Sequence, residues 1–232
     1  MTPENDVGKA IKAIISEGIK HCNKASNNIT DEENSNRLNE SNEMVKLAKK
    51  YLKNELDYEQ IDLSTDKIKD LYKKAEEYLN NAINIYKNNA EAYFLLGIIY
   101  ESRGHLDNAV DEYKKATKLD KNYTEANLHL GVLYLLKGDY KNARKKFESS
   151  ANNNIYAKLC LGLIDYIIVG KGAKEQGLKY INMVRDKLPN ETMNSIELAI
   201  KNINPEKKDC VISDKIISAI HIAAKQETMR HL

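Results

Sequence analysis

The sequence is poor in the residues that interrupt or stiffen a chain. Among its 232 residues there are three prolines, ten glycines, two phenylalanines and no tryptophan. So few turn-forming residues argue against an all-β sandwich or barrel, whose many short strands need frequent turns. Because proline and glycine also weaken helix interiors most, their scarcity favours an all-α fold.

Cysteine is equally scarce. Cys22, Cys160 and Cys210 are odd in number, widely separated and without any CxxC spacing. Neither a disulfide framework nor a zinc site is therefore indicated. The first fifteen residues do not place an apolar segment after a basic one, so no secretory signal is expected. We expect a cytoplasmic protein with no metal ion and no cofactor.

Charge and apolar runs exclude two further classes of partner. The formal net charge is only +2, which gives no overall attraction to nucleic acid. No apolar run approaches the roughly 18 residues of a membrane-spanning helix, so no membrane span is expected. Apolar residues nevertheless make up 42% of the chain, which is enough to build a folded core.

A 34-residue repeat organises the centre of the chain. Two stretches, one beginning at Ala90 and the other at Thr124, align without gaps. Repeats of 20–50 residues are typical of solenoids, in which each unit buries its apolar face against the next. The matching positions are Leu96/Leu130, Gly97/Gly131, Tyr100/Tyr134, Gly104/Gly138, Ala109/Ala143, Tyr113/Phe147 and Ala116/Ser150.

This pattern resembles the tetratricopeptide repeat family. The family unit is a helix–turn–helix with a Leu-Gly pair, a Tyr, a turn glycine, a small residue, an aromatic residue, a second small residue and a closing proline. The two central repeats match it closely, whereas the closing proline occurs only at Pro189. The resemblance implies an α-α superhelix of about four repeats with extra terminal helices. It also implies protein–protein interaction without enzymatic activity.

The glycines and aspartates of the repeat have a physical rationale. Gly97 and Gly131 lie within helices, where glycine costs about 1 kcal/mol relative to alanine. Such glycines are tolerated where a neighbouring helix must approach closely, so we expect a tight contact at both. The remaining expectations are turns at Gly104 and Gly138 and helix caps at Asp107 and Asp139.

We divide the chain into three parts. Residues 1–40 are expected to hold an N-terminal helix and a polar segment that is either a linker or an extension of the next helix. Residues 191–232 are expected to form capping helices, the last over Val211–Arg230. The array between them has repeats at about 41–89, 90–123, 124–154 and 155–190.

Two repeats depart from the regular spacing. Tyr51 and Ala75 are 24 positions apart, against 9 for the equivalent Tyr100 and Ala109. This difference predicts a 15-residue insertion and a longer helix after Asp66. In the fourth repeat, Leu161-Gly162 comes three residues early, which leaves two registers open for its first helix.

The resemblance implies that the first helices of the repeats line a concave groove. Most of its residues are apolar and should not all stay in contact with water. The chain's own terminal helix, a partner helix or a second copy could cover them. Acidic groove residues would form a rim that favours a basic partner. The expected groove residues are Glu91, Phe94, Leu95, Ile98, Glu101, Glu125, Leu128, His129, Val132, Leu135, Leu159, Leu163 and Tyr166.

The function that the sequence favours is a non-enzymatic scaffold or adaptor. It would bind a partner helix or apolar peptide in the groove by shape and apolar complementarity. One alternative is a regulator whose terminal helix occupies the groove until a peptide or partner displaces it. The other is an accessory subunit of a larger enzyme or secretion assembly. Homo-oligomerisation through the same surface is a further possibility.

Other chemical signals are weak. Gly170–Lys174 lacks the pattern and the strand context of a phosphate-binding loop, so we interpret it as a turn. His129 is expected to make a hydrogen bond or packing contact rather than to bind metal. Cys160 is expected to be a small buried residue. Lysine-rich stretches on the second helices indicate a solvated convex face, and no aromatic stacking pattern for nucleic acid accompanies them.

Overall fold

Helices are the only regular elements in the part of the chain that the structure describes. This computed structural model describes residues 31–53, 66–166, 173–188, 190, 193–194, 196–198, 212 and 214–230. A helix covers residues 31–53. The following elements are α2 (Asp66–Ile85), α3 (Ala90–Ser102), α4 (Leu106–Leu119), α5 (Thr124–Leu136), α6 (Tyr140–Ser150), α7 (Ile155–Ile164), α8 (Lys174–Val184), η2 (Arg185–Lys187) and α10 (Asp214–Arg230).

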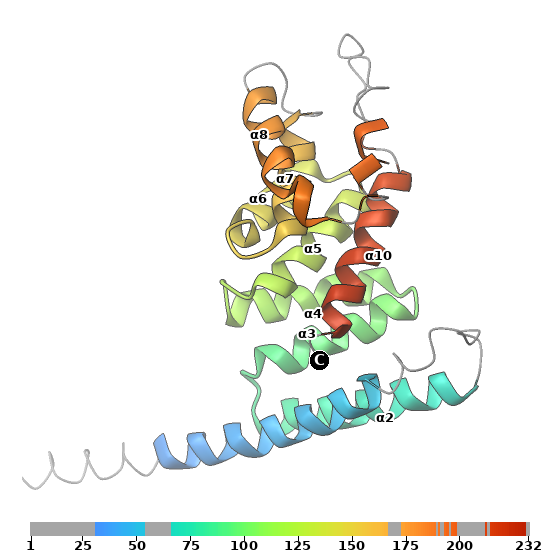
Figure 1. Cartoon of the computed structure of the whole chain (residues 1–232). Helices are drawn as coiled ribbons and strands as arrows, with labels where there is room; N and C mark the ends of the chain where they lie inside the picture. Colours follow the sequence, from blue (N-terminus) through green and yellow to red (C-terminus); the bar gives the residue numbers. More distant parts are fainter. Residues whose placement is uncertain are drawn as a thin grey trace, which may run out of the picture.

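The helices stack as hairpins into a superhelix. Helix α3 packs on α4, α5 on α6 and α7 on α8, while α2, α4 and α6 also contact the first helix of the next pair. Figure 1 shows this stack rising from α2 to α8. The predicted all-α solenoid is confirmed. No described helix is both long enough and apolar enough to cross a membrane.

Gly97 and Gly131 each allow a close contact between the two helices of a hairpin, as the sequence analysis expected. A Cβ atom at Gly131 would lie 2.6 Å from Cε1 of Phe147, and one at Gly97 would overlap the ring of Tyr113. Each aromatic ring therefore lies directly against the backbone of the facing helix. The packing of each hairpin thus depends on a glycine in its first helix.

The turns and caps confirm the sequence interpretation except at one residue. Gly104 and Gly138 have φ of 77° and 72°, a left-handed conformation that glycine adopts without strain. Asp139 caps α6 by accepting a hydrogen bond from the backbone N–H of Asn142 at 3.1 Å. The predicted cap at Asp107 is wrong, because His105 holds that position. Asp107 lies in the first turn of α4 and pairs with Lys137.

The fourth repeat adopts the early register. Helix α7 begins at Ile155, so the Leu-Gly pair at 161–162 takes the place of Leu130-Gly131. A Cβ atom at Gly162 would lie 2.9 Å from the carbonyl oxygen of Gly177 and 3.0 Å from Cγ1 of Ile181. Here two backbones meet where the central repeats have a glycine against an aromatic ring.

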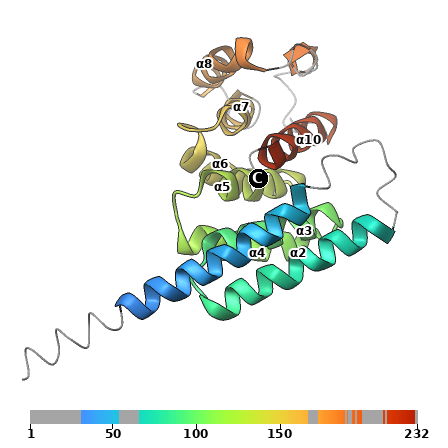
Figure 2. The same cartoon turned by 60° about the horizontal axis from the view of Figure 1, so that its bottom comes forward.

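The helix over 31–53 runs antiparallel to α2 (Figure 2). The expected boundary at residue 40 falls inside it, so the polar residues 31–42 extend this helix. The buried Ser41 hydroxyl donates to the carbonyl of Ala82 at 2.8 Å and accepts from Nδ2 of Asn89 at 2.9 Å. Asn89 also caps α3. These bonds fix the first helix to the start of the next repeat.

Helix α2 has 20 residues, against 14 in α4, which confirms the longer helix expected after Asp66. The insertion expected around residues 56–66 falls almost wholly on residues 54–65, which lie outside the described residues. The expected helix over Asp6–Cys22 also lies outside them.

A lysine bridges repeats two and three. Nζ of Lys146 on α6 donates to Oγ1 of Thr117 on α4 and to Oδ1 of Asn127 on α5, both at 3.2 Å. Asn127 also donates to the carbonyls of Lys121 and Tyr123 in the intervening turn. Partial burial, with Lys145 nearby, lowers the pKa of Lys146. One side chain thereby connects three helices.

Candidate functional site

The first helices α3, α5 and α7 carry the residues that sequence analysis assigned to the groove, except Tyr166, which follows the end of α7. Glu91 and Tyr166 are half-buried and Glu125 is exposed. The other ten are buried, so the inner wall is covered in this structure. The buried ones are Phe94, Leu95, Ile98, Glu101, Leu128, His129, Val132, Leu135, Leu159 and Leu163.

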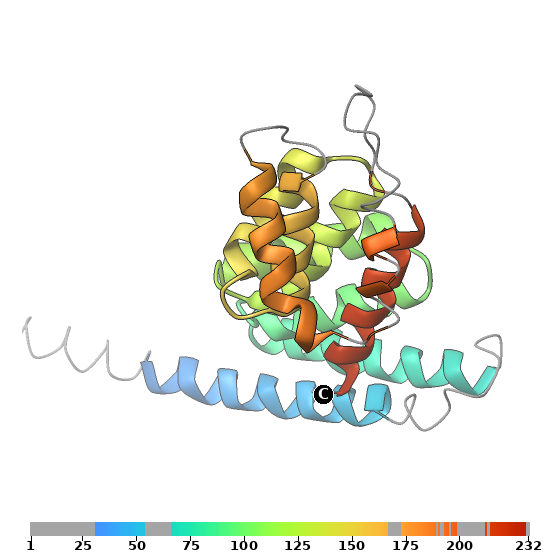
Figure 3. The same cartoon turned by 45° about the horizontal axis from the view of Figure 1, so that its top comes forward.

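Helix α10 provides part of this cover. It packs against α5 and runs along the stack (Figures 1 and 3). Its buried face belongs to one continuous apolar cluster with residues of α5 and α7, and Met229 belongs to the cluster around Phe94. Ile222, on the opposite side, is 58% exposed. The residues of α10 buried in the cluster with α5 and α7 are Ile216, Ile217, Ile220 and Ala224, and the partly buried Ala223 packs against it.

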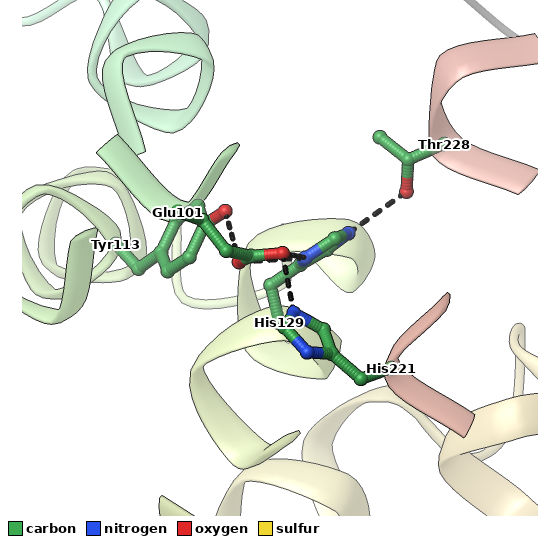
Figure 4. Close-up of polar contacts among 5 residues, drawn as sticks. All are labelled: Glu101, Tyr113, His129, His221 and Thr228. Atoms are coloured by element: carbon green, nitrogen blue, oxygen red, sulfur yellow. Dashed lines mark hydrogen bonds and ion pairs between the residues drawn. The ribbon is translucent and has the colours of Figure 1, made fainter. Parts of the chain in front are cut away.

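A buried carboxylate lies at the centre of the polar contacts beneath α10. Glu101, on the last turn of α3, accepts hydrogen bonds from three side chains, each on a different helix (Figure 4). The Tyr113 hydroxyl donates to Oε2 at 2.7 Å. Nδ1 of His129 lies 3.1 Å from Oε2, and Nε2 of His221 lies 2.7 Å from Oε1. We call Glu101, Tyr113, His129, His221 and Thr228 the clasp.

The ionised carboxylate determines which ring nitrogens carry hydrogen. A carboxylate has no proton to donate, so His129 must donate through Nδ1 and His221 through Nε2. Nε2 of His129 lies 2.9 Å from Oγ1 of Thr228 on α10. A neutral His129 ring accepts from that hydroxyl, and an imidazolium donates to it. The clasp thus connects α10 to α3 and to α5.

Burial and the two neighbouring imidazoles shift the pKa of Glu101 in opposite directions. Burial favours the neutral acid, but the charges and hydrogen bonds of His129 and His221 hold its pKa well below the ordinary value. Burial, together with the neighbouring Glu101, raises the pKa of Tyr113 far above its usual range. Tyr113 therefore stays a hydrogen-bond donor while Glu101 stays ionised.

Aromatic rings enclose the clasp on the side of the array. The ring of His129 lies 5.8 Å from Phe94 in an edge-on arrangement and 5.5 Å from Tyr113. Phe94 also lies 5.0 Å from Tyr123. These rings hold His129 in one orientation, as expected for a hydrogen-bonding histidine rather than a free one.

The three acidic residues expected to form a rim do not form a common exposed surface. Glu101 is 6% exposed and faces two histidines instead of solvent. Glu91 forms an ion pair with Lys49 of the first helix. Of the three expected rim carboxylates, Glu125 alone is exposed. The expectation fails because a carboxylate on an apolar inner wall needs donors when the wall is covered.

Sequence reasoning missed three members of the clasp. Tyr113 was assigned only to packing, and His221 and Thr228 had no role. A usable signal existed, since Glu101 is a polar residue at a position where the next repeat has Leu135. The two α10 residues lie about a hundred positions away in sequence. No local pattern could connect them with Glu101.

Within the described residues no group of three histidine, cysteine or acidic side chains is placed to hold a metal ion. Cys160 is fully buried, and burial raises the pKa of its thiol, which makes it a poor nucleophile. The Gly170–Lys174 segment falls mostly outside the described residues.

Comparison with known families agrees with this architecture. A family model described as TPR repeat matches residues 99–138, and one described as tetratricopeptide repeat matches residues 78–111. No curated protein matches the chain. The matched residues run from the second half of α2 to the turn after α5 and include the signature glycines Gly97, Gly104, Gly131 and Gly138. Residues 78–138 of the chain therefore form tetratricopeptide repeats.

Proposed function

We propose that this chain is a protein–protein interaction module that binds an amphipathic helix along the inner wall of α3, α5 and α7. Helix α10 occupies that place in the resting chain and is exchanged for the partner. Tetratricopeptide repeats typically serve as non-catalytic interaction scaffolds. The proposal adds a binding surface and a resting occupant to that general role.

The observation that carries the proposal is the way α10 is held. It lies on the inner wall through one apolar face, while Ile222 on its other side faces solvent. Two of its polar contacts, made by His221 and Thr228, go to Glu101 and His129, which are side chains of the wall itself. This is how a helical ligand fits a hydrophobic groove. A segment attached in this manner can exchange with a similar helix without unfolding the hairpins beneath it.

A matched pair of substitutions on α10 tests this proposal. Ile217 is 2% exposed and Ile222 is 58% exposed, so Ile217→Asp should release α10 and Ile222→Asp should not. A labelled peptide with the sequence of residues 212–230 is titrated into each full-length variant and followed by fluorescence anisotropy. We expect at least tenfold tighter binding to the Ile217→Asp chain, because its own helix no longer competes.

Circular dichroism of both variants verifies that the hairpins remain folded. Equal peptide affinity for the two variants, or no binding to either, contradicts an exchangeable occupant. Light scattering over a range of concentrations tests the second-copy alternative. A dimer of the unsubstituted chain that disappears in the Ile217→Asp chain would show that α10 is exchanged between copies.

A further inference from the structure

Two wall atoms in the clasp have their main hydrogen-bond partners on α10. Oε2 of Glu101 has two donors from the array, Tyr113 at 2.7 Å and His129 at 3.1 Å. Oε1 has its short contact with His221 of α10 at 2.7 Å and only a longer one, 3.3 Å, with His129. Removal of α10 therefore leaves Oε1 without its main donor.

The second such atom is Nε2 of His129. It lies 2.9 Å from the hydroxyl of Thr228, also on α10. The other nitrogen of the ring is already committed to Glu101. When α10 leaves, the inner wall consequently presents one acceptor on α3 and one imidazole nitrogen on α5, both within an otherwise apolar surface.

Water satisfies both atoms while the groove is open, but an incoming helix expels it. A buried polar atom left without a partner loses its full hydration free energy, and a charged one loses more than a neutral one. A purely apolar helix would cover Glu101 without replacing its donor. The wall therefore disfavours the partners that apolar complementarity alone would select.

The spacing of the two contacts on α10 defines a geometric pattern. His221 and Thr228 are seven residues apart, about two helical turns, so they lie on the same face. Four apolar residues of α10 lie on the same buried face, three of them before His221, by five, four and one positions, and one of them three positions after it. They are Ile216, Ile217, Ile220 and Ala224.

We infer that the groove selects amphipathic helices that present a cationic or imidazole N–H donor to Glu101 and a hydroxyl seven residues later to His129. This inference rests on the proposed function and names the partner chemistry. The donor is a histidine, lysine or arginine with an apolar residue directly before it. The hydroxyl is that of a serine or threonine.

The experiment uses the full chain with Ile217→Asp and synthetic peptides of residues 212–230. The unsubstituted peptide is compared with peptides that carry His221→Ala, His221→Arg or Thr228→Val, and with Ile222→Ala on the exposed side as the matched control. Loss of the donor should weaken binding by on the order of tenfold to a hundredfold. The arginine and control peptides should stay within about threefold, and Thr228→Val should lie between them.

A second variant of the full chain tests whether the loss of peptide affinity depends on Glu101 of the wall. In the chain with both Ile217→Asp and Glu101→Gln, a variant close in size to the wild type, the penalty for His221→Ala should fall several-fold. If all peptides bind the first receptor equally, the inferred selection is overturned while groove binding stands. If none binds it, groove binding itself is overturned, and the inference with it. An undiminished penalty in the Glu101→Gln receptor also overturns the inference.

Discussion

Repeats two and three are built alike and differ at one coupled pair. In repeat two, Glu101 faces the inner side and Tyr113 donates to it from the paired helix. The equivalent residues 34 positions later are Leu135 and Phe147, which carry neither a carboxylate nor a hydroxyl. Both aromatic rings nevertheless occupy the same place, against the helical glycine of their own hairpin.

The difference separates residues that hold each hairpin together from residues that contact the covering helix. The glycine and the aromatic ring are shared because every hairpin needs a close helix contact. The polar pair lies where α10 brings a histidine, whereas the apolar pair belongs to the same apolar cluster as the aliphatic side chains of α10. Glu101 and Tyr113 therefore act as a unit whose partner is the covering helix.

The largest expected effect on stability comes from replacing the polar pair of repeat two with the apolar residue types found at the equivalent positions of repeat three. Glu101→Leu removes the acceptor of Tyr113, His129 and His221 and should lower the free energy of unfolding by about 3 kcal/mol. Urea unfolding followed by circular dichroism measures it. Adding Tyr113→Phe should recover part of the loss, because the hydroxyl would otherwise stay buried without an acceptor.

Glu125 offers the matched control for this substitution. It is an exposed carboxylate on the next first helix, and Glu125→Leu should change stability by less than about 0.5 kcal/mol. Strict additivity of Glu101→Leu and Tyr113→Phe would contradict the view that the pair acts as a unit.

The next effect is a dependence of stability on acid pH. The pKa of Glu101 is lower in the folded chain than in the unfolded one, so the unfolded chain takes up the proton first as the pH falls. The stabilisation is complete well above the ordinary glutamate pKa of about 4.3 and is lost progressively below it. A single such proton gives a slope of up to about 1.4 kcal/mol per pH unit.

Glu101→Gln isolates this contribution. Unfolding free energies between pH 7 and pH 3 should converge for the two chains as the pH falls. Other carboxylates with lowered pKa, such as Asp139 at its cap, remain in both chains and cancel in the difference. Parallel profiles would indicate that Glu101 does not titrate differently in the folded chain.

The smallest expected effect on stability comes from exchanging the aromatic residue types of the two repeats, one position at a time. Tyr113→Phe removes one donor from Glu101 and should cost about 1 kcal/mol of unfolding free energy. Phe147→Tyr would introduce a hydroxyl at the position where repeat three has only Leu135 opposite, and should cost a similar amount. Thermal unfolding of the two single variants checks both. A stabilised Tyr113→Phe chain would show that the hydroxyl is not needed.

The sequence predicted the fold where the constraint is local. Gly97, Gly104 and their counterparts 34 residues later report a close contact and a turn within one hairpin, and the structure confirms each. The cap at Asp107 was mistaken because His105, not Asp107, is the counterpart of Asp139. At the site, the buried inner wall follows from the repeat pattern, and the clasp does not. Its contacts to α10 join residues that are 99 and 120 positions apart, and only the fold brings them together.

The bridge made by Lys146 gives repeats two and three a mechanical property. It connects α4, α5 and α6, while the clasp connects α3, α5 and α10. A solenoid deforms like a spring when adjacent coils rotate relative to one another, and here two separate sets of bonds resist that rotation. Elastic bending should therefore concentrate at the neighbouring coils, which leaves this junction as the rigid segment of the superhelix.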